Sequence, residues 1–63
     1  MANDSLLTYE QAAELLNLSP STLRIYVMQK RIPYIKISKS VRFDRSSLNS
    51  FIDSKRVPAR KEN

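Results

Sequence analysis

Hydrophobic residues recur three and four positions apart in three segments of the chain, which is the spacing of one face of an α-helix. The three groups are Ala12, Leu15 and Leu16, then Leu23, Tyr26 and Val27, and finally Leu48, Phe51 and Ile52. Between the second and third groups, residues 34–43 alternate between hydrophobic and polar side chains, as a half-buried β-strand does. The pattern therefore predicts a mainly α fold in the order helix, helix, small β-hairpin, helix.

Capping signals indicate where the first two helices begin and end. In the string TYEQ, the Thr8 hydroxyl can accept from the Gln11 amide while the Gln11 side chain returns to the Thr8 amide, which is a capping box. Asn17 tolerates a positive φ and is expected to end the first helix. Ser19 is a suitable N-cap for the second helix, with Pro20 in its first turn. The turn between these helices is thus only a few residues long.

The ends of the later elements depend on two prolines and one aspartate. Pro33 cannot continue a helix and restricts the residue before it, so the second helix is expected to end near Lys30 or Arg31. Asp44 is placed to cap the third helix, and Pro58 stops it.

The alternating segment predicts a hairpin that turns through Ser38, Lys39 and Ser40. The pairs expected across this three-residue turn are Ile37 with Val41, Ile35 with Phe43, and Lys36 with Arg42. The four apolar residues would face the core and the two cations would face each other outside. Like charges directly opposite destabilise a hairpin, but a phosphate bound between Lys36 and Arg42 would remove this cost.

Size and composition exclude several classes of protein. The chain has 63 residues, enough for one domain with a small core and no deep pocket, and it contains neither cysteine nor histidine. A disulfide framework and a thiolate zinc site are excluded, and the commonest metal ligand and general base is missing. We expect no enzymatic activity, no catalytic or metal site and no cofactor. An acidic start and the lack of a long apolar run predict a cytoplasmic protein without a membrane span.

The charge is divided unevenly along the chain. Residues 1–18 carry three acidic side chains and no basic one, whereas residues 19–63 hold all 11 lysines and arginines against three acidic residues. A strongly electropositive surface usually binds a polyanion, and nucleic acid is the leading candidate, with a merely solvated basic face as the alternative. The second helix agrees with DNA, because its polar face has serine, threonine, arginine and glutamine and no acidic residue. A plain helical hairpin in a small bundle would nevertheless show the same spacing.

Several strings resemble one known family. LLTYEQAAELLNLSPSTLRIYV, RIPYIKI and VRFDRSSLNSFI, over residues 6–54, are similar to the excisionase-type winged helix-turn-helix domain, a relative of the MerR-like winged helices. The resemblance implies a second helix in the DNA major groove and a two-stranded wing on the backbone or minor groove. Members act as excisionases, which direct a recombinase of a phage or other mobile element, or as small transcription regulators.

Positions carried over from the family define the candidate DNA-binding residues. Those on the recognition helix are Ser21, Thr22, Arg24, Ile25, Gln29 and Lys30, and those on the wing are Lys36, Lys39, Ser40 and Arg42. Arg24 is the strongest candidate, Ile25 suits a thymine methyl, and Met28 is expected to pack instead. The family usually has glycine where this chain has Asn17, Lys30 and Ser38, so these turns either bear about 1 kcal/mol of left-handed strain or open.

We therefore predict a flexible leader over residues 1–6, a monomeric winged helix-turn-helix over 7–54 and a basic, disordered tail over 55–63. The candidate tail contacts are Lys55, Arg56, Arg60 and Lys61. They would hold phosphates, a site-specific recombinase or another copy on DNA, or would only aid solubility. The competing class is a basic protein-interaction module with Ile25 and Met28 as apolar anchors. RNA binding is disfavoured, because no exposed aromatic pair is expected on a sheet.

Overall fold

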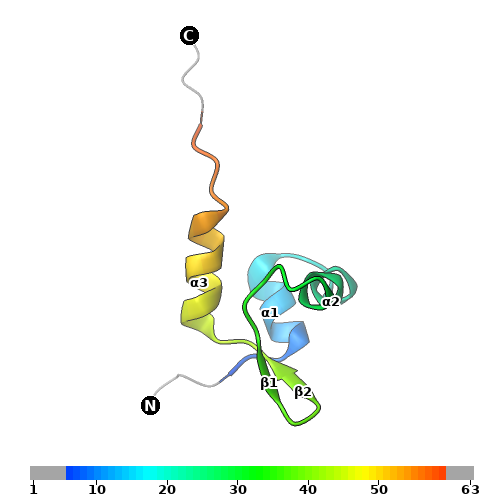
Figure 1. The fold of residues 1–63 in the computed structure, drawn as a ribbon. Coiled ribbons are helices and arrows are strands. Elements are labelled where there is room, and N and C mark those ends of the chain that lie inside the picture. Colours follow the sequence, from blue (N-terminus) through cyan, green and yellow to red (C-terminus); the bar gives the residue numbers. More distant parts are fainter. Residues whose placement is uncertain (1–5, 60–63) are drawn as a thin grey trace.

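The computed structural model describes residues 6–59 and has the predicted fold class, a winged helix-turn-helix (Figure 1). Its elements are α1 (Tyr9–Leu16), α2 (Pro20–Met28), β1 (Ile35–Ile37), β2 (Ser40–Arg42) and α3 (Arg45–Ser54). The two strands form one antiparallel sheet, which projects from the helices as the wing. No helix among the described residues is long and apolar enough to cross a membrane.

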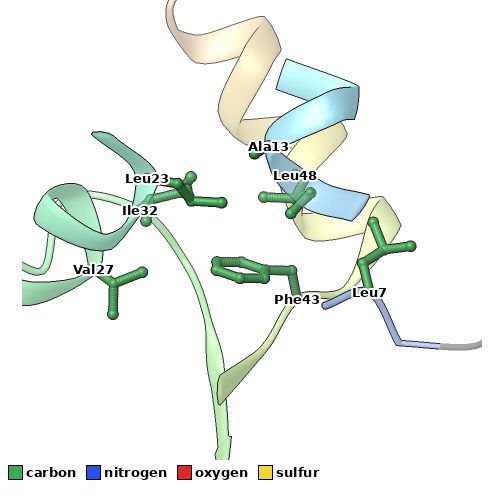
Figure 2. Close-up of a cluster of buried hydrophobic side chains, with 8 residues drawn as sticks. Leu7, Ala13, Leu23, Val27, Ile32, Phe43 and Leu48 are labelled. Atoms are coloured by element: carbon green, nitrogen blue, oxygen red, sulfur yellow. The ribbon is translucent and has the colours of Figure 1, made fainter. Parts of the chain in front are cut away.

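One small hydrophobic core joins every helix to the base of the wing. The buried residues are Leu7, Ala12, Ala13, Leu23, Val27, Ile32, Phe43 and Leu48. Phe43, Leu23 and Leu48 are its largest fully buried side chains. Figure 2 shows the Phe43 ring between Val27 of α2 and Leu7, with Leu48 of α3 above it. Because Phe43 follows β2 directly, its burial anchors the base of the wing in the core.

The first helix is capped as predicted, but its buried face is different. The Thr8 amide donates to Gln11 Oε1 at 3.0 Å and the Gln11 amide to Thr8 Oγ1 at 3.2 Å, which confirms the capping box. Ala12 and Ala13 are buried, whereas Leu15, expected in the core, is 37% exposed. The small side chains at 12 and 13 allow close packing at this face of α1, and the core lies along them.

Both helices of the helix-turn-helix end in a left-handed residue. Asn17 has φ 58° as predicted, and the amides of Asn17 and Leu18 donate to carbonyls of the last turn of α1. Lys30 has φ 55°, and its amide and that of Arg31 donate to Val27 and Tyr26 in the same way. This is the Schellman motif, which normally uses glycine. It ends α2 at Met28, earlier than the predicted Lys30 or Arg31.

The predicted register of the wing is wrong by one residue. Ile35 pairs with Arg42, Lys36 with Val41 and Ile37 with Ser40. The turn contains only Ser38 and Lys39, and Ser38 has φ 58°. Tight two-residue hairpin turns require a positive φ, which serine supplies here in place of glycine.

The corrected register exchanges the faces of the first strand. Val41 and Phe43 lie on the core side with Tyr34, while Ile35 and Ile37 share the outer face with Arg42. Ile37 is 52% exposed, so the expected inward face of four apolar residues does not form. Lys36 and Arg42 lie on opposite faces, and the like-charge pair that called for a phosphate between them is absent.

A residue before α1 pairs with the residue that follows β2. Leu7 and Phe43 form an antiparallel bridge, with their amides donating to each other's carbonyls at 2.7 and 2.9 Å. This pairing fixes the start of α1 against the base of the wing, and no pattern in the sequence indicated it.

The third helix begins at the predicted cap, Asp44. The Asp44 carboxylate accepts from the Ser47 amide at 3.1 Å and from the hydroxyls of Ser46 and Ser47 at 3.1 and 3.0 Å. These bonds, led by the Ser47 hydroxyl, lower the pKa of Asp44. Only Leu48 of α3 is fully buried, and α3 runs away from the wing (Figure 1).

Candidate nucleic-acid interface

One face of α2 is buried and the other is open. Leu23 and Val27 anchor the helix in the core and Tyr26 packs against it, whereas most of the other residues of α2 are exposed. The predicted recognition residues Ser21, Arg24, Ile25, Gln29 and Lys30 are all exposed, and Thr22 is half-buried. Met28 is 75% exposed and so does not pack under the wing, while packing at a protein interface, the other arrangement expected for it, stays a prediction. The open face combines hydrogen-bonding groups with two apolar side chains.

Arg24 is held by an aromatic stack that no sequence pattern indicated. Its guanidinium carbon lies 4.5 Å from the centre of the Tyr9 ring. Tyr9 in turn meets Phe43 edge to face, with ring centres 5.4 Å apart. The guanidinium is therefore connected to the centre of the core through two rings. Stacking leaves the N–H groups in the guanidinium plane free to bind a base edge or phosphate.

The start of α2 is occupied by its own cap. Ser19 Oγ accepts from the Thr22 amide at 3.1 Å and donates to the Thr22 hydroxyl at 3.0 Å. Ser21 remains exposed beside this cap. Capping explains the presence of Ser19 and Thr22 without DNA, so the role of Thr22 in phosphate binding stays a prediction.

Lys30 lies between the end of α2 and the wing. Its Nζ is 3.2 Å from the Tyr34 hydroxyl and 5.8 Å from the centre of the Tyr34 ring. Both side chains leave positions close to the entrance of the hairpin. The Lys30 ammonium is thus directed toward the wing. The positive φ of this residue would cost less with glycine at this position.

The wing presents cations in three directions. Lys36 and Arg42 lie on opposite faces, and Lys39 lies in the turn beside Ser40. Arg42 is half-buried and its Nη1 donates to the Val41 carbonyl at 2.8 Å. Lys36, Lys39 and Ser40 are exposed. The cations therefore point to both faces of the wing and to its tip. An arrangement of this kind can bind phosphates on either side of the tip without two cations facing each other.

The arrangement agrees with a comparison with known protein families. A family model described as a helix-turn-helix domain matches residues 6–56, which is most of the chain and includes every helix and strand that the structure describes. The chain belongs to this family. It is therefore a DNA-binding helix-turn-helix domain. No curated protein and no solved structure matches it.

One stretch of this helix-turn-helix domain contains basic residues and no acidic ones. From residue 19 to residue 43 there are six basic residues and no acidic one: Arg24, Lys30, Arg31, Lys36, Lys39 and Arg42. By contrast, α1 exposes Glu10 and Glu14. The region formed by α2 and the wing is thus electropositive, and its charge attracts phosphate. Within residues 6–59, no group of three or more potential ligands is arranged to hold a metal ion.

The predicted tail contacts divide into two groups. Lys55 and Arg56 lie at the end of α3, where Lys55 covers the Phe51 ring at 5.5 Å and Arg56 Nε binds Asp53 Oδ1 at 2.7 Å. Arg60 and Lys61 lie outside the described residues. Lys55 and Arg56 thus lie at the end of α3, the helix that runs away from the wing (Figure 1).

Proposed function

We propose that this helix-turn-helix domain binds double-stranded DNA sequence-specifically, with α2 in the major groove and the wing on the adjacent backbone. The observation that carries the proposal is the open face of α2, where Arg24 is exposed yet held by Tyr9. An arginine fixed before binding loses less side-chain freedom when it pairs with a guanine edge. The absence of acidic residues from residue 19 to residue 43 leaves this face free of charge repulsion toward phosphate.

Each exposed residue of α2 has a role in this proposal. Arg24 reads a guanine, Ile25 meets a thymine methyl, and Gln29 reads a base edge or binds the backbone. Ser21 and Thr22 donate to phosphates beside the helix N-terminus, where backbone amides also favour an anion.

The cations at the wing provide affinity without reading sequence. Lys30, Lys36, Lys39 and Arg42 neutralise phosphates, and Ser40 donates to one. With Arg24 and one further cation, about six contacts would lower log K against log salt with a slope of roughly −5. A nearly flat dependence would contradict this part of the proposal.

We infer that the biological role is that of an excisionase, with a site-specific recombinase and further copies of the chain as candidate partners on DNA. The support is the resemblance of residues 6–54 to excisionase-type domains. A small transcription regulator of a mobile element is the second candidate, because the same fold serves both roles.

Footprinting and DNA bending on the sequence flanking the gene distinguish these roles. Tandem protected sites with a strong bend beside a recombinase gene support an excisionase, whereas one protected promoter site supports a regulator. A salt-sensitive shift of random duplex without any preferred footprint would instead favour the basic protein-interaction module, with Ile25 and Met28 as its exposed anchors.

A further inference from the structure

An open groove separates the outer half of α3 from the helix-turn-helix. Its volume is about 510 Å³. Leu16, Leu18 and Tyr26 line one wall, and Phe51 and Ile52 line the other. Leu48 is the last fully buried residue of α3, and Phe51, one turn further on, packs against the core with part of its surface still exposed. All five lining residues are only half-buried, which leaves apolar surface on both walls of the groove.

Cations surround this apolar surface. Arg31 lies over the Tyr26 ring at 5.3 Å and Lys55 over the Phe51 ring at 5.5 Å, one on each wall. Arg56 also lines the groove but is paired with Asp53. Three cations and one carboxylate give the rim a net charge of +2. A ligand that fits must therefore bring both apolar side chains and negative charge.

The groove is separate from the proposed DNA-binding face. Tyr26 points into the groove, whereas Ile25 and Met28 on the same helix are exposed elsewhere. Lys55 is at the end of α3 that is distant from the wing (Figure 1). Duplex DNA presents phosphates and sugars at its surface, which match the rim but not the apolar walls.

We propose that this groove binds an acidic amphipathic helix of a protein partner. Apolar residues spaced i, i+3, i+4 and i+7 on that helix lie between the two walls, as in other helix-in-groove complexes. Its acidic residues face Arg31 and Lys55. The partner helix extends the small core of the domain by covering the outer turn of α3. The site is independent of the DNA-reading face, so both ligands bind at once.

The test is a titration of the full chain, labelled for NMR, with a synthetic peptide about 11 residues long, or three helical turns. The peptide has leucine at i, i+3, i+4 and i+7 and glutamate at most other positions. Two control peptides have the same composition in scrambled order, or lysine in place of glutamate. We expect shifts centred on Leu18, Tyr26 and Ile52 with the acidic amphipathic peptide, and much weaker binding of both controls.

A pair of charge reversals separates this site from DNA binding. Lys55→Glu is expected to weaken peptide binding about fivefold or more, because an attraction becomes a repulsion, and to lower duplex affinity much less than Lys39→Glu does. Lys39→Glu at the wing tip is the matched control, with unchanged peptide affinity and weaker duplex binding. Both substitutions are on exposed side chains, and thermal unfolding verifies that each variant is folded.

Four results would overturn the proposal. The first is equal binding of the scrambled peptide, and the second is a set of shifts centred on Ile25 and Met28. Another is a loss of duplex affinity in Lys55→Glu as large as in Lys39→Glu, which would assign the rim to DNA. The last is the appearance of the same shifts when the protein concentration alone is raised, which would assign the groove to a second copy of the chain. Failure of DNA binding by the unmodified chain would contradict the proposed function and not this site.

Discussion

The left-handed conformation of Lys30 leads to a prediction in which stability and DNA binding change in opposite directions. Its φ of 55° costs an L-residue roughly 1–2 kcal/mol, which glycine avoids. Glycine also gives the unfolded chain more freedom, which offsets about 0.5–1 kcal/mol of that gain. Lys30→Gly is therefore expected to raise the free energy of unfolding by about 0.5–1 kcal/mol. Loss of the exposed contact between Lys30 and Tyr34 reduces this gain.

Lys30→Ala is the matched control, because it removes the same side chain and keeps the left-handed strain. We expect Lys30→Gly to be more stable than Lys30→Ala by about 1 kcal/mol, which for a domain of this size shifts Tm by about 4–8 °C. Thermal unfolding followed by far-ultraviolet circular dichroism measures this difference. Both variants lose one cation, so both are expected to lower the salt slope of duplex binding by about 0.9.

Equal stability of the two variants would refute the reasoning, because it would mean that α2 does not end in a strained left-handed residue. An unchanged salt slope in both would remove Lys30 from the set of phosphate contacts while leaving the account of stability intact.

Three further predictions test other parts of the structure. Tyr9→Leu is expected to weaken specific DNA binding about two- to fivefold by releasing Arg24, and Tyr9→Phe is expected to restore it, as gel shifts with specific and random duplex will measure. The pKa of Asp44 is lowered in the folded state, so the ionised carboxylate stabilises the protein above the ordinary carboxyl pKa of 3.8, and this stabilisation is lost as the pH falls below that value. Asp44→Asn is therefore expected to make Tm fall less steeply at acid pH, and an unaltered fall would contradict this. Because Ile37 is on the outer face and Val41 on the core side, Ile37→Thr is expected to change the free energy of unfolding by less than about 0.5 kcal/mol and Val41→Thr to lower it by about 1 kcal/mol. Urea unfolding measures both, and equal losses would favour the register in which both residues face inward.

The elements that depend on adjacent residues could be predicted from the sequence. The capping box of Thr8 and Gln11 and the caps at Ser19 and Asp44 each need only a hydroxyl or carboxylate and an amide three residues away. Such bonds form whenever the local helix forms, so the tertiary structure does not alter them. The open face of α2 was likewise predictable, because its buried residues repeat with the helical period.

The wing register could not be predicted in this way. It depends on whether Ser38 adopts a positive φ, which costs a serine energy that the rest of the sheet must supply. The bridge between Leu7 and Phe43 and the burial of Tyr34, Val41 and Phe43 favour the tight turn, and these are tertiary contacts. One residue of difference in the turn was enough to place Ile35 and Ile37 on the outer face.

The support of Arg24 and the groove beside α3 also depend on tertiary geometry. Tyr9 and Arg24 belong to different helices, and only the packing of α1 against α2 brings the ring under the guanidinium. The groove depends on the direction in which α3 leaves its cap at Asp44. A stripe of Leu48, Phe51 and Ile52 predicts a buried helix face equally well whether or not its last turn is covered.

The measurement that most directly tests the central claim is the affinity of Arg24→Ala for the footprinted site and for random duplex of the same length and salt. The account predicts a loss of roughly 1–3 kcal/mol on the specific site and a much smaller loss on random duplex, because α2 reads bases through this residue. Equal losses on both duplexes would assign Arg24 to the backbone and contradict the role of α2 as the reading helix.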